Sequence, residues 1–238
     1  MKPGIDIIIL NYNNTGLIEK CLNGILNNTF CDYKLIVIDQ GSIDGSQDYL
    51  KGSSIPHKLI LNKENTGAWE GRNQGVREAE HEWQMFFDSD TEIRDPAWDA
   101  KMLEEGKDPK VGLVEAKVEL YNGDLRFAGF AGSMIRNEVF RELGLFDHHF
   151  IIGGDNDFWV KFYWNGKFQI RYCKTTDIFH YCGGTINRGC MKEQSKALHQ
   201  AYREDMMRLK YSDKFLNMTV CRMNNKRIDE EFKMGWRK

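Results

Sequence analysis

The sequence contains the stretch Trp83-Gln84-Met85-Phe86-Phe87-Asp88-Ser89-Asp90, in which a short apolar run leads directly into two aspartates. Residues 83–87 predict a buried strand, because short apolar runs rich in aromatic residues fill the centre of parallel sheets. In open sheets of this kind, ligands bind beyond the carboxyl ends of the strands. The two carboxylates are therefore expected at the rim of a binding site.

The chain on the N-terminal side of this stretch repeats the same kind of unit. Predicted strands and helices alternate in the order strand 5–10, helix 17–26, strand 35–38, helix 46–50, strand 58–61 and helix 71–79. Such alternation is typical of a parallel sheet with helices on its faces. The first two of these strands end in polar clusters that begin at Asn11 and Asp39. The sequence predicts an α/β fold with a mostly parallel central sheet flanked by helices over residues 1–95, and a ligand site where these strands end.

The alternation fades after residue 95, and a more mixed sheet is expected over residues 96–211. The elements predicted there are strands at 111–118, 125–133, 169–172 and 176–179, and helices at 136–143, 155–163 and 191–211. Residues 1–211 are expected to form one domain, with residues 212–238 as a tail or surface appendage.

Length and composition set outer limits on function. The 238 residues suffice for one large domain, and 33 basic against 35 acidic residues give a net charge of −2, which argues against nucleic acid as a partner. No apolar run near the start is long enough for a signal peptide or a membrane span. The six cysteines form no C-x-x-C pair, which favours reduced thiols. We expect a soluble, cytoplasmic protein.

Two carboxylates at the end of a buried strand are able to bind a divalent cation. Carboxylate oxygens suit Mg²⁺ or Mn²⁺, and such a cation can neutralise a departing diphosphate. The simpler interpretation is a capped turn, because aspartate and serine are common turn residues. The position of Asp88 and Asp90 directly after an apolar run favours the metal site.

Two later features suit the same chemistry. Asp155 and Asp157 open a predicted helix, where an aspartate is ordinarily a cap but is also able to act as a general base. His180 follows a predicted strand; a lone histidine is more often structural, yet neutral imidazole is a good ligand for Mn²⁺.

Several motifs follow one another along the chain. Besides Asp88-Ser89-Asp90, they are Asn11-Tyr12-Asn13, Asp39-Gln40-Gly41-Ser42-Ile43-Asp44-Gly45-Ser46, Asn65-Thr66-Gly67-Ala68-Trp69-Glu70-Gly71-Arg72-Asn73-Gln74-Gly75, Gly154-Asp155-Asn156-Asp157 and His180-Tyr181-Cys182-Gly183-Gly184-Thr185. Taken in this order, they resemble the family-2 inverting glycosyltransferases of the glycosyltransferase A fold, over most of residues 5–185. The resemblance implies that fold, with a Rossmann-like nucleotide-binding half over residues 1–95 and an acceptor half over residues 96–211. Gln40 departs from the family's usual asparagine, and Gly154 stands where its E-D-x-D motif has glutamate. The C-terminal part of the match is similar to rhamnosyltransferase-like members.

The resemblance implies a role for each motif. Asp39 would contact the nucleobase and Arg72 the nucleotide. Asp90 and His180 would ligate Mn²⁺ or Mg²⁺, with Asp88 at the ribose or in the metal shell. Asp155 would be the catalytic base, while Asp157 would support the local structure. The remaining donor-binding residues implied by the family are Asn11, Tyr12, Asn13, Asn65, Gly67, Asn73 and Ser89.

The expected reaction is a single displacement that moves a sugar from a nucleoside diphosphate, with UDP- or dTDP-sugars favoured by the family, to a glycan, lipid-linked or protein hydroxyl. Polysaccharide biosynthesis is the expected context. One competing interpretation is a sugar-phosphate nucleotidyltransferase, which would carry a basic glycine-rich loop where this chain has Asn11-Tyr12-Asn13-Asn14. Another is a non-catalytic nucleotide-sugar binding module. Basic residues within 191–211 are a candidate for peripheral membrane contact, although neighbouring acids favour a merely solvated face.

Overall fold

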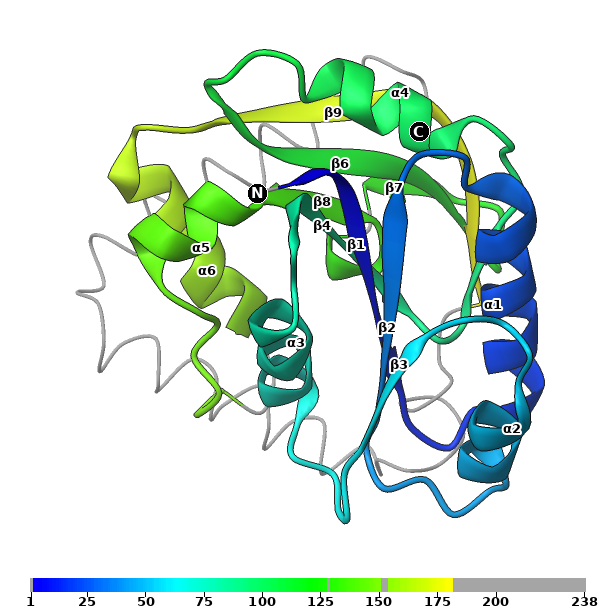
Figure 1. Ribbon diagram of the computed structural model, residues 1–238. Coiled ribbons are helices and arrows are strands. Elements are labelled where there is room, and N and C mark those ends of the chain that lie inside the picture. Colours follow the sequence, from blue (N-terminus) through cyan, green and yellow to red (C-terminus); the bar gives the residue numbers. More distant parts are fainter. Residues whose placement is uncertain (1, 128, 151–153, 182–238) are drawn as a thin grey trace.

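The computed structural model describes residues 2–127, 129–150 and 154–181. In this part of the chain, nine strands form one sheet in the order β3-β2-β1-β4-β8-β6-β9-β5, with β7 paired to β6. Figure 1 shows the sheet running through the molecule with helices on both sides. The strands are β1 (Lys2–Asn11), β2 (Tyr33–Asp39), β3 (Lys58–Leu61), β4 (His81–Asp88), β5 (Thr91–Ile93), β6 (Val111–Leu120), β7 (Leu125–Phe127), β8 (Ser133–Arg136) and β9 (Gln169–His180). The helices are α1 (Thr15–Asn28), α2 (Ser46–Gly52), α3 (Ala68–Arg77), α4 (Trp98–Glu105), α5 (Asn137–Leu143) and α6 (Gly154–Asn165), with a 3₁₀ turn at Gly129–Ala131.

The N-terminal half is a parallel sheet covered on both faces. Strand β1 pairs in parallel with β2 on one side and with β4 on the other. Ile5, Ile7 and Ile9 of β1 pack into the same cluster as the buried side of α1, whereas Ile8 packs with α3, α5 and α6. Because successive side chains of a strand point to opposite faces, one apolar strand serves both clusters.

The order of these strands fixes where a ligand binds. The chain passes from β1 to β2 on one side and later returns to β4 on the other, so β1 and its neighbours form a topological switch point. At their carboxyl ends Asn11 is opposite Asp39, and Leu10 is opposite Asp88. The polar ends of three strands are therefore brought to one edge of the sheet.

The second half extends the sheet with mixed strands. Strand β8 is antiparallel to β4 and to β6, and β9 runs parallel to β6. The end of β9 then pairs with β5, so that His180 is opposite Thr91. Because β5 begins directly after Asp90, this pairing returns the chain to the end of β4.

Most of the predicted elements are confirmed, and three differ. Residues 125–133 are not one strand, because the 3₁₀ turn at Gly129–Ala131 separates β7 from β8. The two strands expected at 169–172 and 176–179 are one strand, β9, whose pairing with β6 shifts register between Ala116 and Val118. Strand β5 and helix α4 were not predicted. The helix expected at 191–211 and the tail at 212–238 lie outside the described residues.

The described helices are all too short or too polar to cross a membrane.

Candidate functional site

Three side chains from two distant segments of the chain, the end of β4 and the end of β9, meet at one place. His180 Nε2 lies 3.0 Å from Asp90 Oδ1 and 3.9 Å from Asp88 Oδ2. One ligand atom from each of the three lies within 4.8 Å of the other two. Atoms that share one cation at about 2.1 Å are at most about 4.2 Å apart, so a small adjustment of the side chains suffices to bind it.

Backbone hydrogen bonds fix this cluster. The Ser89 amide donates to the carbonyl of Leu10 (3.1 Å), and the Tyr181 amide donates to the carbonyl of Asp90 (2.9 Å). The Ser89 hydroxyl accepts a hydrogen bond from the Asn14 amide group at 3.0 Å. The turn after β4 is therefore tied both to β1 and to the end of β9.

Arg72 of α3 supplies positive charge to the cluster. The residue is 6% exposed, and its guanidinium donates to Asp88 Oδ1 at 2.6 Å. Burial raises the pKa of Asp88, the Arg72 charge opposes this effect, and the nearby Asp90 carboxylate adds to it. Burial lowers the pKa of His180, but Asp90 and Asp88 outweigh this effect, so the net pKa is raised. Two crowded carboxylates beside an imidazole are an arrangement that a divalent cation would stabilise.

A second polar cluster lies where β1 and β2 end. The Asp39 carboxylate is buried and accepts hydrogen bonds from Asn11 (2.8 Å), Ser42 and Gln47. Asn13 has a positive φ of 49°, a conformation that asparagine tolerates better than most residues. Its amide donates to Ser42 Oγ at 2.8 Å, while its side-chain oxygen accepts from the Ile43 amide. These hydrogen bonds join the loop that follows β1 to the loop that follows β2, and the Asp39 carboxylate accepts its hydrogen bonds from side chains and amides of the protein itself.

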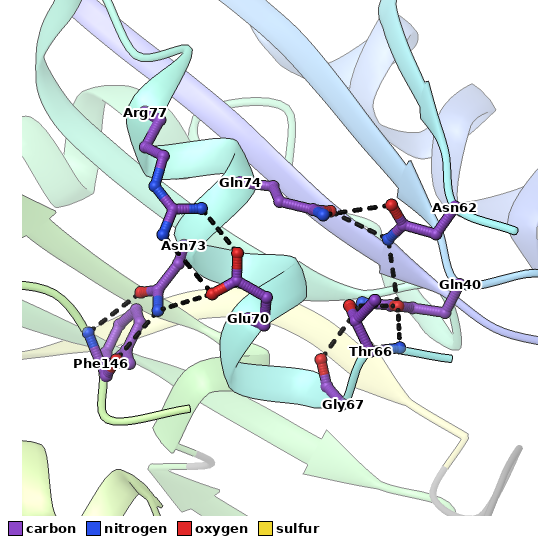
Figure 2. Close-up of polar contacts among 9 residues, drawn as sticks. All are labelled: Gln40, Asn62, Thr66, Gly67, Glu70, Asn73, Gln74, Arg77 and Phe146. Carbon is purple, nitrogen blue, oxygen red and sulfur yellow. Dashed lines mark hydrogen bonds and ion pairs between the residues drawn. The ribbon is translucent and has the colours of Figure 1, made fainter. Parts of the chain in front are cut away.

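Gln40 organises the loop that leads into α3. Its side-chain oxygen accepts from Asn62 and from both the amide and the hydroxyl of Thr66, and its nitrogen donates to the Gly67 carbonyl (Figure 2). A Cβ on Gly71 would lie 1.9 Å from Gln40 Nε2. The glutamine that departs from the family pattern is therefore packed against one of the motif's glycines. Asn65 caps this loop by accepting a hydrogen bond from the Gly67 amide.

Asn73 is directed away from the carboxylate cluster. Its amide nitrogen donates to the Phe146 carbonyl at 2.9 Å, and its oxygen accepts from the Phe146 amide at 3.0 Å (Figure 2). Both groups are buried, so Asn73 holds the segment after α5 against α3. Its expected contact with the donor stays a prediction, as do those of Asn11, Tyr12, Asn13, Asp39, Asn65 and Gly67.

The expected base lies in the first turn of α6. Asp155 is half-buried, whereas Asp157 is fully buried and forms an ion pair with Lys161 at 2.9 Å. Gly154 packs against Trp69, because a Cβ on it would lie 2.7 Å from the indole nitrogen. The Arg72 guanidinium carbon lies 5.1 Å from the Trp69 ring. Contacts through Trp69 and Arg72 therefore connect the start of α6 with Asp88.

Sequence reasoning missed Asn14 and Trp69. Asn14 was the next residue after a recognised polar motif, and only the bond to Ser89 reveals its place. Trp69 lies inside the motif that begins at Asn65, but an aromatic residue in a predicted helix is ordinarily assigned to the core. Its position beside Gly154 depends on a contact between segments far apart in the chain.

Comparisons with known proteins agree with this architecture. The sequence model described as glycosyl transferase family 2 matches residues 6–185. Glycosyltransferase AglE of Haloferax volcanii is 26% identical over 180 residues, which cover 64% of this chain and 59% of that protein. The chain thus spans less than two thirds of this relative's length.

Solved structures show the same fold. A mannosyltransferase of Pyrobaculum calidifontis in complex with GDP-Man and Mn²⁺ aligns with a TM-score of 0.62 at 17% identity, covering 84% of this chain and 61% of the other. TarS 1–349 of S. aureus in complex with UDP-GlcNAc aligns with a TM-score of 0.62 at 18% identity, covering 77% and 59%. The expected glycosyltransferase A fold is confirmed, while the rhamnosyltransferase-like subgroup stays a prediction.

Proposed function

This chain belongs to glycosyl transferase family 2, and we propose that it transfers a sugar from a nucleoside diphosphate to a hydroxyl acceptor with inversion of configuration. The observation that carries the proposal is the convergence of Asp88, Asp90 and His180 at the switch point of the sheet. The catalytic domain is proposed to comprise residues 1–211.

The chemistry of the three ligands supports a divalent cation. Two carboxylates and one imidazole are a donor set that suits Mn²⁺, and Mg²⁺ less well because of the nitrogen ligand. Asp90 and His180 would hold the cation, with Asp88 as a third ligand or as a ribose contact. When bound, the cation would act as a Lewis acid toward the diphosphate leaving group.

The side chains around this cluster have separate roles in the proposed reaction. Arg72 holds Asp88 in place and limits the negative charge that a diphosphate meets. Asp155 takes the proton from the acceptor hydroxyl as that oxygen bonds to the anomeric carbon. The bond between the anomeric carbon and the diphosphate oxygen breaks in the same step, so configuration inverts.

The class of donor is supported by the similar proteins. The mannosyltransferase structure contains GDP-Man and Mn²⁺, and the TarS structure contains UDP-GlcNAc. A nucleotide sugar is therefore the proposed donor, with UDP- or dTDP-sugars as first candidates. The proposed acceptors are glycan, lipid-linked or protein hydroxyls, in cytoplasmic polysaccharide biosynthesis.

A screen of nucleotide sugars with Mn²⁺ tests the function. We expect at least one donor to release its nucleoside diphosphate, slowly with water and faster with an acceptor. Asp155→Asn is expected to lower the transfer rate by about 10²- to 10⁴-fold, because a general base contributes on that order. Asp177→Asn, a change at an exposed aspartate of β9, is the matched control.

Two results would replace the proposed function, and a third would remove the proposed catalytic base. Release of pyrophosphate from a nucleoside triphosphate and a sugar phosphate would indicate a nucleotidyltransferase. Binding of nucleotide sugars without turnover under any acceptor condition would indicate a binding module. Full activity of Asp155→Asn would remove this residue as the base.

A further inference from the structure

Trp69 has a buried indole nitrogen without a hydrogen-bond partner. Its side chain is 7% exposed, and Nε1 has no partner within residues 2–127, 129–150 and 154–181. A buried donor left unpaired costs about 1–3 kcal/mol. Such groups are few in native proteins and often have a role that a ligand completes.

The nitrogen lies beside the start of α6. A Cβ on Gly154 would lie 2.7 Å from Trp69 Nε1 and 2.8 Å from both Cδ1 and Cδ2, so the helix begins over the face of this indole, beside its nitrogen. Phe130 and Phe146 fix the ring, with centroids 5.4 and 5.6 Å away. The indole is thus framed by aromatic side chains, and Gly154, which contacts it, directly precedes Asp155.

Other N–H groups gather at the same place. Arg72 stacks on Trp69, and its Nε is also buried and unpaired within the described residues. The first amides of α6, a helix of 12 residues, lack partners inside the helix. These donors therefore lie close to Trp69, between the arginine that contacts Asp88 and the start of α6, and such a group of donors favours a ligand rich in oxygen acceptors.

We propose that Trp69 Nε1–H donates a hydrogen bond to an oxygen of the transferred sugar: a hydroxyl, an N-acyl carbonyl or a carboxylate. This inference rests on the proposed function. The sugar is favoured over the diphosphate because Trp69 borders the residue next to the proposed base, where the anomeric carbon must lie. A sugar oxygen that reaches this nitrogen requires the surrounding side chains to part, as active sites commonly do on binding.

The test compares Trp69→Phe with the wild type. Phenylalanine keeps an aromatic ring at this position but removes the N–H group together with the pyrrole part of the indole, a loss of volume that the Trp98→Phe control shares. The probes are UDP-N-acetylglucosamine, GDP-mannose and a dTDP-hexose, each compared with its free diphosphate in Mn²⁺ by calorimetry. For the donor that the wild type binds best, we expect Trp69→Phe to weaken affinity about tenfold while leaving the free diphosphate unchanged.

The control is Trp98→Phe. Trp98 is also buried, but its Nε1 donates to Thr29 Oγ1 at 3.1 Å on the opposite face of the sheet. This variant is expected to lose stability without any change in sugar-nucleotide affinity. A second arm measures the affinity for deoxy analogues of the donor. In the wild type, removing the recognised oxygen should weaken binding to the same extent as the Trp69→Phe substitution does. In Trp69→Phe, removing that oxygen should cause no further weakening.

Two outcomes overturn the inference. Equal weakening of the nucleotide sugar and the free diphosphate would assign the N–H group to the diphosphate. Unchanged affinity for both, with no sensitivity to any single sugar oxygen, would make Trp69 a packing residue only. Absence of binding of every nucleotide sugar to the wild type is a different result, because it contradicts the proposed function itself.

Discussion

Replacing Arg72 with methionine removes the positive charge that compensates Asp88. Methionine retains much of the apolar contact with Trp69 and Phe130, so the loss is mainly electrostatic. The two charges are joined at 2.6 Å, and Arg72 is almost fully buried while the Asp88 side chain is 33% exposed. The variant therefore isolates one ion pair at the candidate site.

The size of the effect follows from this geometry. Two unit charges about 4 Å apart interact by about 4 kcal/mol at an effective dielectric constant of about 20. The exposure of Asp88 reduces this value through solvent screening. We therefore expect a coupling free energy of about 2–3 kcal/mol between Arg72 and Asp88, and a comparable loss of unfolding free energy in Arg72→Met.

A double-mutant cycle with Asp88→Asn measures this coupling by urea denaturation. The control is the pair Arg77–Glu70 on α3, which has the same 2.6 Å separation but an arginine side chain that is 51% exposed, against 7% for Arg72. We expect less than about 1 kcal/mol for the control pair. A coupling free energy between Arg72 and Asp88 that is no larger than the one between Arg77 and Glu70 would refute the reasoning.

The stability that Arg72→Met loses relative to the wild type is also expected to depend on pH. Burial and Asp90 already raise the pKa of Asp88, and loss of Arg72 raises it further. A carboxyl whose folded pKa lies above its unfolded value destabilises the fold once pH rises through the folded pKa. The stability deficit of Arg72→Met is therefore expected to be larger at about pH 7 than at about pH 4. A deficit that is independent of pH would contradict this explanation.

Three further outcomes are expected. Gly71→Ala should cost about 1–3 kcal/mol in thermal unfolding and weaken nucleotide binding, because its Cβ would collide with Gln40; Gly52→Ala, with open space around it, should be neutral or slightly stabilising. Asp155→Asn should retain Mn²⁺ and nucleotide affinity in calorimetry while losing transfer, and parallel loss of both would argue against a base. Burial raises the pKa of the Cys31 thiol to about 12, so little reactive thiolate is present at about pH 8 and alkylation of Cys31 in the native chain should be slow. Peptide mass spectrometry measures the labelling of this residue, and rapid labelling of Cys31 would contradict the expectation.

The sequence was sufficient to predict the parallel half of the fold because its strands are short, strongly apolar runs that alternate with helical stretches. Four β-rich stretches separated by helical stretches have few alternative arrangements. Strand β5 escaped prediction because its three residues are held by pairing with β9, a partner almost ninety residues away. The sequence predicts a single strand over residues 125–133 because the side-chain pattern alone does not reveal the 3₁₀ turn at Gly129–Ala131.

The candidate site was predictable through its motifs but not through its contacts. Asp88, Asp90 and His180 were expected together only because the order of motifs resembled a family, and the antiparallel pairing of β5 with β9 supplies the physical cause. Asn73 and Trp69 show the limit of such reasoning. Their neighbours are Phe146 and Gly154, and no local pattern indicates contacts between segments so far apart.

The most direct test of the central claim is a Mn²⁺ titration followed by electron paramagnetic resonance, with UDP present at a fixed concentration. The wild-type chain is expected to bind one Mn²⁺, and Asp90→Asn and His180→Ala are each expected to weaken that binding by at least about tenfold. Asp155→Asn should bind Mn²⁺ like the wild type. Equal Mn²⁺ affinity in the wild type, Asp90→Asn and His180→Ala would contradict the assignment of the cation to this cluster.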